Sequence, residues 1–270
     1  ADCTLLSGNI VNKEGSCINV YGDYANSSET MPIFTMNGGN VVCEECFYLD
    51  AKKYGAKLVV NGGNVNAKEL AISAFNNKDK AVDITINGGK LCSNGDYGIT
   101  INGNYGGATV TITGGEIENG KCCAIYMPGQ NTYSITGGKF TGREALVVKG
   151  GTWNITGGEF NATGEAKNPE SPDGSGYSPT GDSLYIEDNY GEKTSQHNIT
   201  MNISNAKFSS KNGYAMSCRF FNEAEGKQPA VVNLEENVHL TSAEDKKKIC
   251  FANGFLGNVT GVDDDCIERK

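Results

Sequence analysis

The sequence is poor in several residue types on which common functional classes depend. Its 270 residues include only two histidines, one tryptophan and three arginines, and the formal net charge is −9. A nucleic-acid-binding protein needs a clustered basic surface to displace counterions from phosphates, so this composition predicts no nucleic-acid partner. No apolar run approaches the about 20 residues of a membrane-spanning helix, and no membrane span is expected. Because P-loop and dinucleotide fingerprints are also missing, we predict no cofactor.

Cysteine, in contrast, is abundant. Ten cysteines form an even set in a chain without enzyme signatures, which is typical of disulfide-bonded proteins of oxidising compartments. The chain starts at Ala1 without an initiator methionine, as expected for a secreted, extracellular protein whose export signal has been removed. Cys43 and Cys46 have the spacing of half a zinc site, but no second pair of this kind follows, so no metal site is predicted.

A repeat organises the whole chain. A Gly-Gly pair follows a short alternating segment at intervals of 20 to 26 residues, and degenerate copies precede and follow the regular series, which gives about nine copies. The regular pairs are Gly38-Gly39, Gly62-Gly63, Gly88-Gly89, Gly114-Gly115, Gly137-Gly138 and Gly157-Gly158.

A second motif follows most of these pairs: a small residue, an apolar residue, any residue and another apolar residue, as in Gly98-Ile99-Thr100-Ile101. Alternation with period two points one side of each segment inward, and glycine supplies the positive φ of a sharp corner. Short strands and tight corners without helical periodicity predict a coil of parallel strands. The repeat runs from end to end, so we predict one domain, 1–270, with a loop insertion at about 161–181.

These two motifs resemble those of the right-handed parallel β-helix, pectin-lyase-like superfamily, and in particular its non-catalytic Gly-Gly-repeat surface proteins and adhesins. The predicted fold is therefore an all-β, single-stranded right-handed parallel β-helix of about nine coils. The superfamily also includes polysaccharide lyases, glycoside hydrolases and carbohydrate-binding modules, so the resemblance implies the fold more strongly than an activity.

Outward positions of successive coils should stack into columns. A row that alternates Lys and Glu after the Gly-Gly pairs, and a second row of Lys149, Glu187 and Arg219, are interpreted as charge ladders that fix the register. An uncharged row of Thr and Asn is compatible with ice binding, because regular Thr-X-Thr rows can order surface water; polar residues also simply suit exposed strands. The outward tyrosines Tyr48, Tyr126 and Tyr185 are the candidate glycan-binding residues, because exposed rings stack on sugars.

Cysteines at equivalent positions of adjacent coils are candidates for disulfides. Acceptor sequons for N-glycosylation occur six times. The disulfide candidates are Cys218 with Cys250, Cys92 with Cys122, and Cys17 with Cys46, and the sequons are at Asn26, Asn154, Asn161, Asn198, Asn202 and Asn258.

No column places two carboxylates on consecutive coils, as a glycosidase would require, so the sequence favours a protein without catalytic residues. The leading interpretation is a secreted, non-catalytic structural or adhesive β-helix whose partners are its own copies, stacked end to end into filaments, or a polysaccharide. The alternatives are a polysaccharide lyase or glycoside hydrolase with a site beside the 161–181 insertion, and an ice-binding protein.

Overall fold

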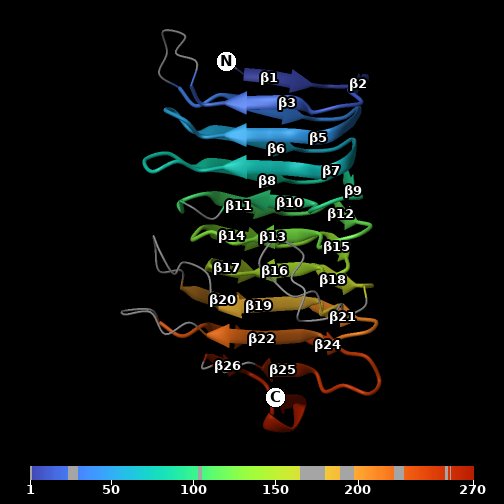
Figure 1. Cartoon of the computed structure of the whole chain (residues 1–270), viewed down its shortest axis with the longest axis vertical. Coiled ribbons are helices and arrows are strands. Elements are labelled where there is room, and N and C mark those ends of the chain that lie inside the picture. The colour runs from blue at the N-terminus through green and yellow to red at the C-terminus, as the bar shows by residue number, and fades with distance from the viewer. Residues whose placement is uncertain are drawn as a thin grey trace.

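The structure is a computed structural model that describes residues 2–23, 30–102, 105–164, 180–188, 198–221, 228–252, 255 and 257–270, without the side chains of 188, 220 and 221. Apart from one short 3-10 turn, Asp264–Cys266, the regular elements of this part of the chain are β-strands. Successive coils stack along one axis, and the two termini lie at opposite ends of the stack (Figure 1). The predicted all-β parallel β-helix is thus confirmed, whereas its handedness and coil number remain predictions. None of the described helical segments is long and apolar enough to cross a membrane.

One parallel sheet, face A, contains ten strands, and each of them pairs with the strands of the neighbouring coils. In spatial order the strands are β1 (Asp2–Leu5), β4 (Ile33–Met36), β6 (Ala56–Val60), β8 (Val82–Ile86), β11 (Thr109–Ile112), β14 (Thr132–Ile135), β17 (Gly151–Ile155), β20 (Ile199–Ile203), β23 (Val231–Leu234) and β26 (Asn258–Thr260).

The second sheet folds into two columns of parallel strands, faces B and C, which the long strands β5 (Asn40–Asp50) and β7 (Asn64–Phe75) join. Face B continues with β2 (Asn9–Val11), β9 (Lys90–Ser93), β12 (Glu116–Asn119), β15 (Lys139–Gly142), β18 (Glu159–Ala162), β21 (Lys207–Ser210) and β24 (His239–Thr241). Face C continues with β3 (Ser16–Tyr21), β10 (Ile99–Ile101), β13 (Ile125–Met127), β16 (Leu146–Val148), β19 (Leu184–Asp188), β22 (Met216–Phe221), β25 (Ile249–Ala252) and β27 (Ile267–Arg269).

The interior is built from like residues stacked on like residues. Ile86, Ile112 and Ile135 occupy equivalent register positions on β8, β11 and β14, and each is buried. Phe160 stacks between Phe140 and Phe208, with ring centroids 4.6 and 4.5 Å apart. Burying each such side chain contributes about 1.5–3 kcal/mol, and no coil could bury its inner face without its neighbours.

The corner between faces A and B depends on the second glycine of each pair. Gly63 has a φ of +92°, and a Cβ built on it would lie 2.5 Å from Met36 Cε and 2.7 Å from the Gly39 carbonyl oxygen. Beside this corner Asn61 donates a hydrogen bond to Asn37 at 2.7 Å, and Asn87 donates to Asn61 at 2.8 Å. Amides at equivalent positions therefore satisfy one another and help to hold the register.

The predicted charge ladder at the start of face B is confirmed as a register column. Each of its members is the register partner of the next on the neighbouring coil, in the order Lys90, Glu116, Lys139, Glu159 and Lys207. Glu159 lies 3.0 Å from Lys207 Nζ, and Lys90 lies 3.5 Å from Glu116.

The disulfide predictions are wrong. Cys17 pairs with Cys43, not with Cys46, at a Cα–Cα distance of 6.0 Å. Cys46 is buried, and its thiol donates to the Asn66 carbonyl oxygen at 3.5 Å.

Register also separates the other two predicted pairs. Cys218 aligns with Phe251 and Cys250 with Ser217, so the two cysteines lie on opposite sides of face C. Cys218 packs in the central core, while Cys250 packs in an outer cluster with Tyr214. Cys92 aligns with Glu118, which precedes Cys122 by four residues. The Cys92 thiol donates its hydrogen to the Glu118 carboxylate at 3.6 Å. Alternation on one strand cannot reveal such shifts, because it does not fix the register between coils.

Candidate functional site

Three aromatic rings lie next to one another on the outside of face C in the first coils. The Tyr48 ring of β5 has its centroid 5.8 Å from that of Tyr21 on β3 and 5.2 Å from that of Phe75 on β7. Tyr21 is 37% exposed, and the other two rings are half-buried. We call Tyr21, Tyr48 and Phe75 the aromatic strip. Among the predicted tyrosines, Tyr48 is the one that keeps a solvent-facing ring.

A charged pair borders the strip. Lys52 Nζ lies 2.8 Å from Asp50 Oδ2, and this hydrogen-bonded contact raises the pKa of Lys52. Partial burial, and after it the Asp50 carboxylate, raises the pKa of Tyr48. The Tyr48 hydroxyl is therefore protonated at neutral pH and can both donate and accept hydrogen bonds. The strip thus combines apolar ring faces with a hydroxyl, a carboxylate and an ammonium group.

Tyr126 and Tyr185 also project outward from face C, but the expectation that they are exposed is wrong. Tyr126 is 6% exposed and Tyr185 is fully buried. They pack with Cys122, Cys123 and Val147 in a hydrophobic cluster separate from the central core, and Tyr97 stacks on Tyr126 at 4.5 Å. These rings therefore stabilise an outer layer instead of offering a sugar a free face.

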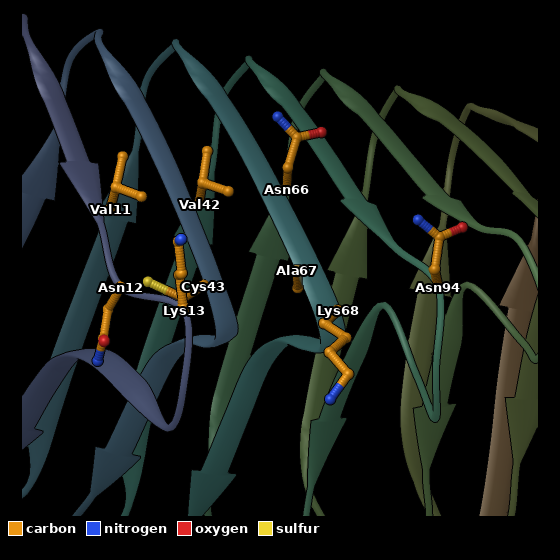
Figure 2. Close-up of a pocket in the computed structure, with 9 residues that line it drawn as sticks. All are labelled: Val11, Asn12, Lys13, Val42, Cys43, Asn66, Ala67, Lys68 and Asn94. Carbon is orange, nitrogen blue, oxygen red and sulfur yellow. The ribbon is translucent and has the colours of Figure 1, made fainter.

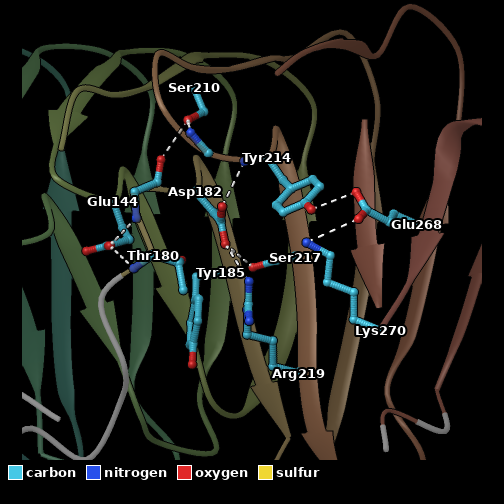
Figure 3. Close-up of polar contacts among 12 residues, drawn as sticks. Glu144, Thr180, Asp182, Tyr185, Ser210, Tyr214, Ser217, Arg219, Glu268 and Lys270 are labelled. Atoms are coloured by element: carbon cyan, nitrogen blue, oxygen red, sulfur yellow. Dashed lines mark hydrogen bonds and ion pairs between the residues drawn. The ribbon is translucent and has the colours of Figure 1, made fainter. Parts of the chain in front are cut away.

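A network of polar contacts lies near Tyr185 on face C (Figure 3). The Asp182 carboxylate accepts hydrogen bonds from the Tyr214 backbone N–H at 2.8 Å and from the Ser217 hydroxyl at 2.6 Å, and Arg219 lies 3.5 Å away. Further along face C the Tyr214 hydroxyl donates to Glu268 at 2.7 Å, and Glu268 also pairs with Lys270 at 3.1 Å.

Glu144 is held in the same way. Its carboxylate accepts the backbone N–H groups of Thr180 and Gly181, each at 2.8 Å, and pairs with Arg143 at 2.9 Å. This network was not anticipated from the sequence, which contains no local pattern that brings residues 144 and 180 together. Because the carboxylates of Glu144 and Asp182 are buried and each has several partners, the geometry favours a structural role for them. Among the described residues no group of three or more His, Cys, Asp and Glu side chains could hold a metal ion.

A groove of about 430 Å³ lies near the start of the chain, where the Asn12–Lys13 turn faces β5, β7 and β9 (Figure 2). Its apolar part comes from Val11, Val42 and Ala67, and the other lining residues are Asn12, Lys13, Cys43, Asn66, Lys68 and Asn94. Sequence reasoning missed this groove because its walls come from four coils and meet only through the register.

The outer side of face A carries an ordered polar surface. Eight residues form two columns over β11, β14, β17 and β20, and each lies beside its equivalent on the next coil. All eight are exposed or half-buried, and none is charged or aromatic. We call this surface the hydroxyl–amide array; it consists of Thr109, Thr111, Thr132, Ser134, Thr152, Asn154, Thr200 and Asn202.

The predicted glycosylation sites are spread over several faces. Asn154, Asn202 and Asn258 lie on face A and Asn161 on face B. The Asn154 and Asn202 amides take part in a ladder, since Asn202 donates to Asn154 at 3.2 Å. Asn198 accepts a hydrogen bond from the Gln228 N–H at 3.1 Å. Asn26 and most of the 161–181 insertion lie outside the described residues, and the use of these sequons stays a prediction.

Comparison with known proteins finds no family model, no curated protein and no solved structure that matches this chain.

Proposed function

We propose that the protein is an extracellular, non-catalytic β-helix that adheres to polysaccharide through the aromatic strip. The observation that carries the proposal is the contact of Tyr48 with Tyr21 and Phe75 on successive coils, at centroid distances of 5.8 and 5.2 Å. Sugar C–H faces stack on such rings, while tyrosine hydroxyls hydrogen-bond to sugar hydroxyls. The extracellular location rests on the ten cysteines, two of which form the Cys17–Cys43 disulfide.

The neighbouring polar groups support a carbohydrate ligand over a purely apolar one. Asp50 and Lys52 stand beside the rings as an acceptor and a donor, and they are joined at 2.8 Å. Ligand sites commonly combine an apolar surface with a few fixed polar groups that set orientation. The three rings lie on three successive coils, with neighbouring centroids 5.8 and 5.2 Å apart, so an extended chain of sugars is a better match than a compact ligand.

A glycan array probed with the wild-type protein and two variants tests this function. Tyr48→Ala removes the central ring and should weaken binding to every retained glycan about tenfold, equivalent to about 1.4 kcal/mol. Tyr105→Ala is the matched control, because Tyr105 is 46% exposed and lies outside the strip. Unchanged binding by Tyr48→Ala, or equal loss in both variants, would contradict the proposal.

The enzymatic alternative, a lyase or hydrolase, is tested with the same glycans. Incubation with each retained polysaccharide, with and without calcium, followed by detection of unsaturated products and new reducing ends, should show no turnover. Product formation would favour the enzyme.

Self-assembly into filaments is a separate prediction, and sedimentation of concentrated protein should reveal species larger than the monomer.

A second candidate function is ice binding, and the hydroxyl–amide array favours it. Threonine hydroxyls on Thr109, Thr132, Thr152 and Thr200 repeat in register along one column. Such a rigid lattice can order a layer of water at the strand spacing of about 4.8 Å. Ser134→Lys would disrupt the centre of the array, with Thr141→Lys on face B as control. Thermal hysteresis that Ser134→Lys abolishes and Thr141→Lys retains would establish this function, and its absence in the wild type would exclude it.

A further inference from the structure

We propose that the groove beside the Cys17–Cys43 disulfide is a second saccharide site, which binds a neutral sugar unit. The groove has a volume of about 430 Å³, within the about 300–1,000 Å³ of ordinary small-molecule sites. The inference rests on the proposed carbohydrate binding but concerns a different surface, on face B and its corner instead of the outside of face C.

The floor of the groove is apolar. Val42 is 40% exposed and Val11 is 63% exposed, and both are aligned on neighbouring strands next to the buried Ala67. Exposed valines on consecutive strands cost free energy in water, and a ligand that covers them recovers part of it. The C–H face of a sugar ring is a ligand with this complementarity.

The rim supplies amides that are available to a ligand. The corner asparagines of this protein pair with each other, as Asn61 does with Asn37 and Asn87. Among the described residues, by contrast, the side-chain amides of Asn66 and Asn94 have no hydrogen-bond partner, and both line the groove (Figure 2). A carboxamide donates two hydrogen bonds and accepts two, which suits adjacent sugar hydroxyls.

The charges around the groove favour a neutral sugar over an acidic one. Lys68 pairs with Glu44 at 3.1 Å, and Glu69 and Glu14 add to the negative field that raises the pKa of Lys68. Lys13 contributes one more ammonium group to the lining. The lysines are thus balanced by nearby carboxylates and act as hydrogen-bond donors without creating a net positive site.

The disulfide fixes the wall that carries Asn12 and Lys13. Cys17–Cys43 joins β3 to β5, the Asn12 N–H donates to the Val42 carbonyl oxygen at 2.9 Å, and the Gly15 N–H donates to Glu44 at 2.8 Å. A wall held at three points loses little conformational freedom when a ligand binds. Reduction of the disulfide removes one of these points, so the groove should bind more weakly in reducing conditions.

Titration of the protein with cellobiose and with N,N′-diacetylchitobiose, followed by NMR of backbone and side-chain amides, tests the groove. The expected result is a shift of the Asn66 and Asn94 side-chain signals by at least one of the two probes. The double variant Asn66→Ala/Asn94→Ala should weaken this binding at least tenfold, whereas the control Asn161→Ala, in the same outward column four coils away, should leave it unchanged.

The outcomes separate the groove from the aromatic strip. Tyr48→Ala should leave the groove shifts intact, and reduction of the disulfide should weaken them several-fold. Shifts confined to the strip would overturn the groove proposal and leave the proposed function standing. Groove binding together with a failed glycan array would support the groove and overturn the strip. Absence of any groove shift with both probes, or unchanged affinity in the double variant, overturns the groove.

Discussion

Lys149 Nζ lies 3.2 Å from Glu187 Oε1, and each side chain is only 2% exposed. Both residues project from the outer side of face C, where a solvated charge ladder was expected. The Tyr185 hydroxyl donates to the second oxygen of Glu187 at 2.7 Å, so the carboxylate is satisfied on both sides. The row of Lys149, Glu187 and Arg219 therefore belongs to a buried network that stabilises an outer layer of face C.

Removal of Lys149 should destabilise the protein strongly. Lys149→Ala leaves the Glu187 carboxylate buried without its counter-charge, which typically costs about 3–5 kcal/mol. Urea unfolding followed by circular dichroism measures this loss as a shift of the midpoint. The matched control is Lys207→Ala, which breaks the ion pair with Glu159 at 3.0 Å between side chains that are 62% and 50% exposed. That exposed pair should contribute roughly 0–1 kcal/mol, and equal losses in the two variants would contradict the buried network.

A corner can require glycine because its φ is positive or because a Cβ would collide with its neighbours, and Gly63 and Gly8 allow these two reasons to be compared. Both have a positive φ, +92° and +94°, but a Cβ on Gly63 would collide with Met36 and Gly39, whereas a Cβ on Gly8 meets nothing within 4 Å. Gly8→Ala should lower the free energy of unfolding by only about 1–2 kcal/mol, which is the cost of placing a non-glycine residue in the left-handed conformation. Gly63→Ala should cost clearly more, because the neighbouring backbone must move. Thermal unfolding of the two variants gives the comparison, and similar melting temperatures would refute the close packing of the corner.

Thiol labelling should distinguish the cysteines by exposure. Cys3 is exposed, whereas Cys46 is buried and desolvation raises its pKa to about 12. Because the thiolate is the reactive form, iodoacetamide at mildly alkaline pH should modify Cys3 in the folded protein and spare Cys46. Cys17 and Cys43 should become reactive only after reduction. Peptide mass spectrometry reads out all four sites, and rapid labelling of Cys46 in the native protein would argue against the burial described for β5.

The fold could be predicted from the sequence because its determinants are local and repeated. Alternation places Ile86 or Ile112 inward on its own strand, and the Gly-Gly pairs mark where each strand turns. Stacking then follows, since no coil can bury its inner face alone.

The site could be predicted only in part. Tyr48 was found, but Tyr126 and Tyr185 were wrongly expected to be exposed, because burial on the outer face depends on contacts that alternation does not encode. The true partner of Cys17 was missed for a similar reason. Ser16 aligns with Glu45 and Ile18 with Phe47, which places Cys17 opposite Cys46 in a regular ladder. The first coil uses five residues from Val11 to Ser16 where β5 uses three, from Val42 to Glu45, so Cys17 does not simply bond to the residue opposite. This local difference in length leaves no clear mark in the sequence.

The fold requires that equivalent positions of successive repeats lie directly beside one another. Thr109 and Thr132 are such a pair, exposed on adjacent strands of face A, and Thr152 follows one coil further. Mild oxidation of the double variant Thr109→Cys/Thr132→Cys should form a disulfide, because neighbouring strands are about 4.8 Å apart. Thr109→Cys/Thr152→Cys, with its residues about 10 Å apart, should form none. Peptide mapping that finds the 109–132 cross-link alone is the expected result, and a missing 109–132 cross-link or an efficient 109–152 cross-link would contradict the stacked register.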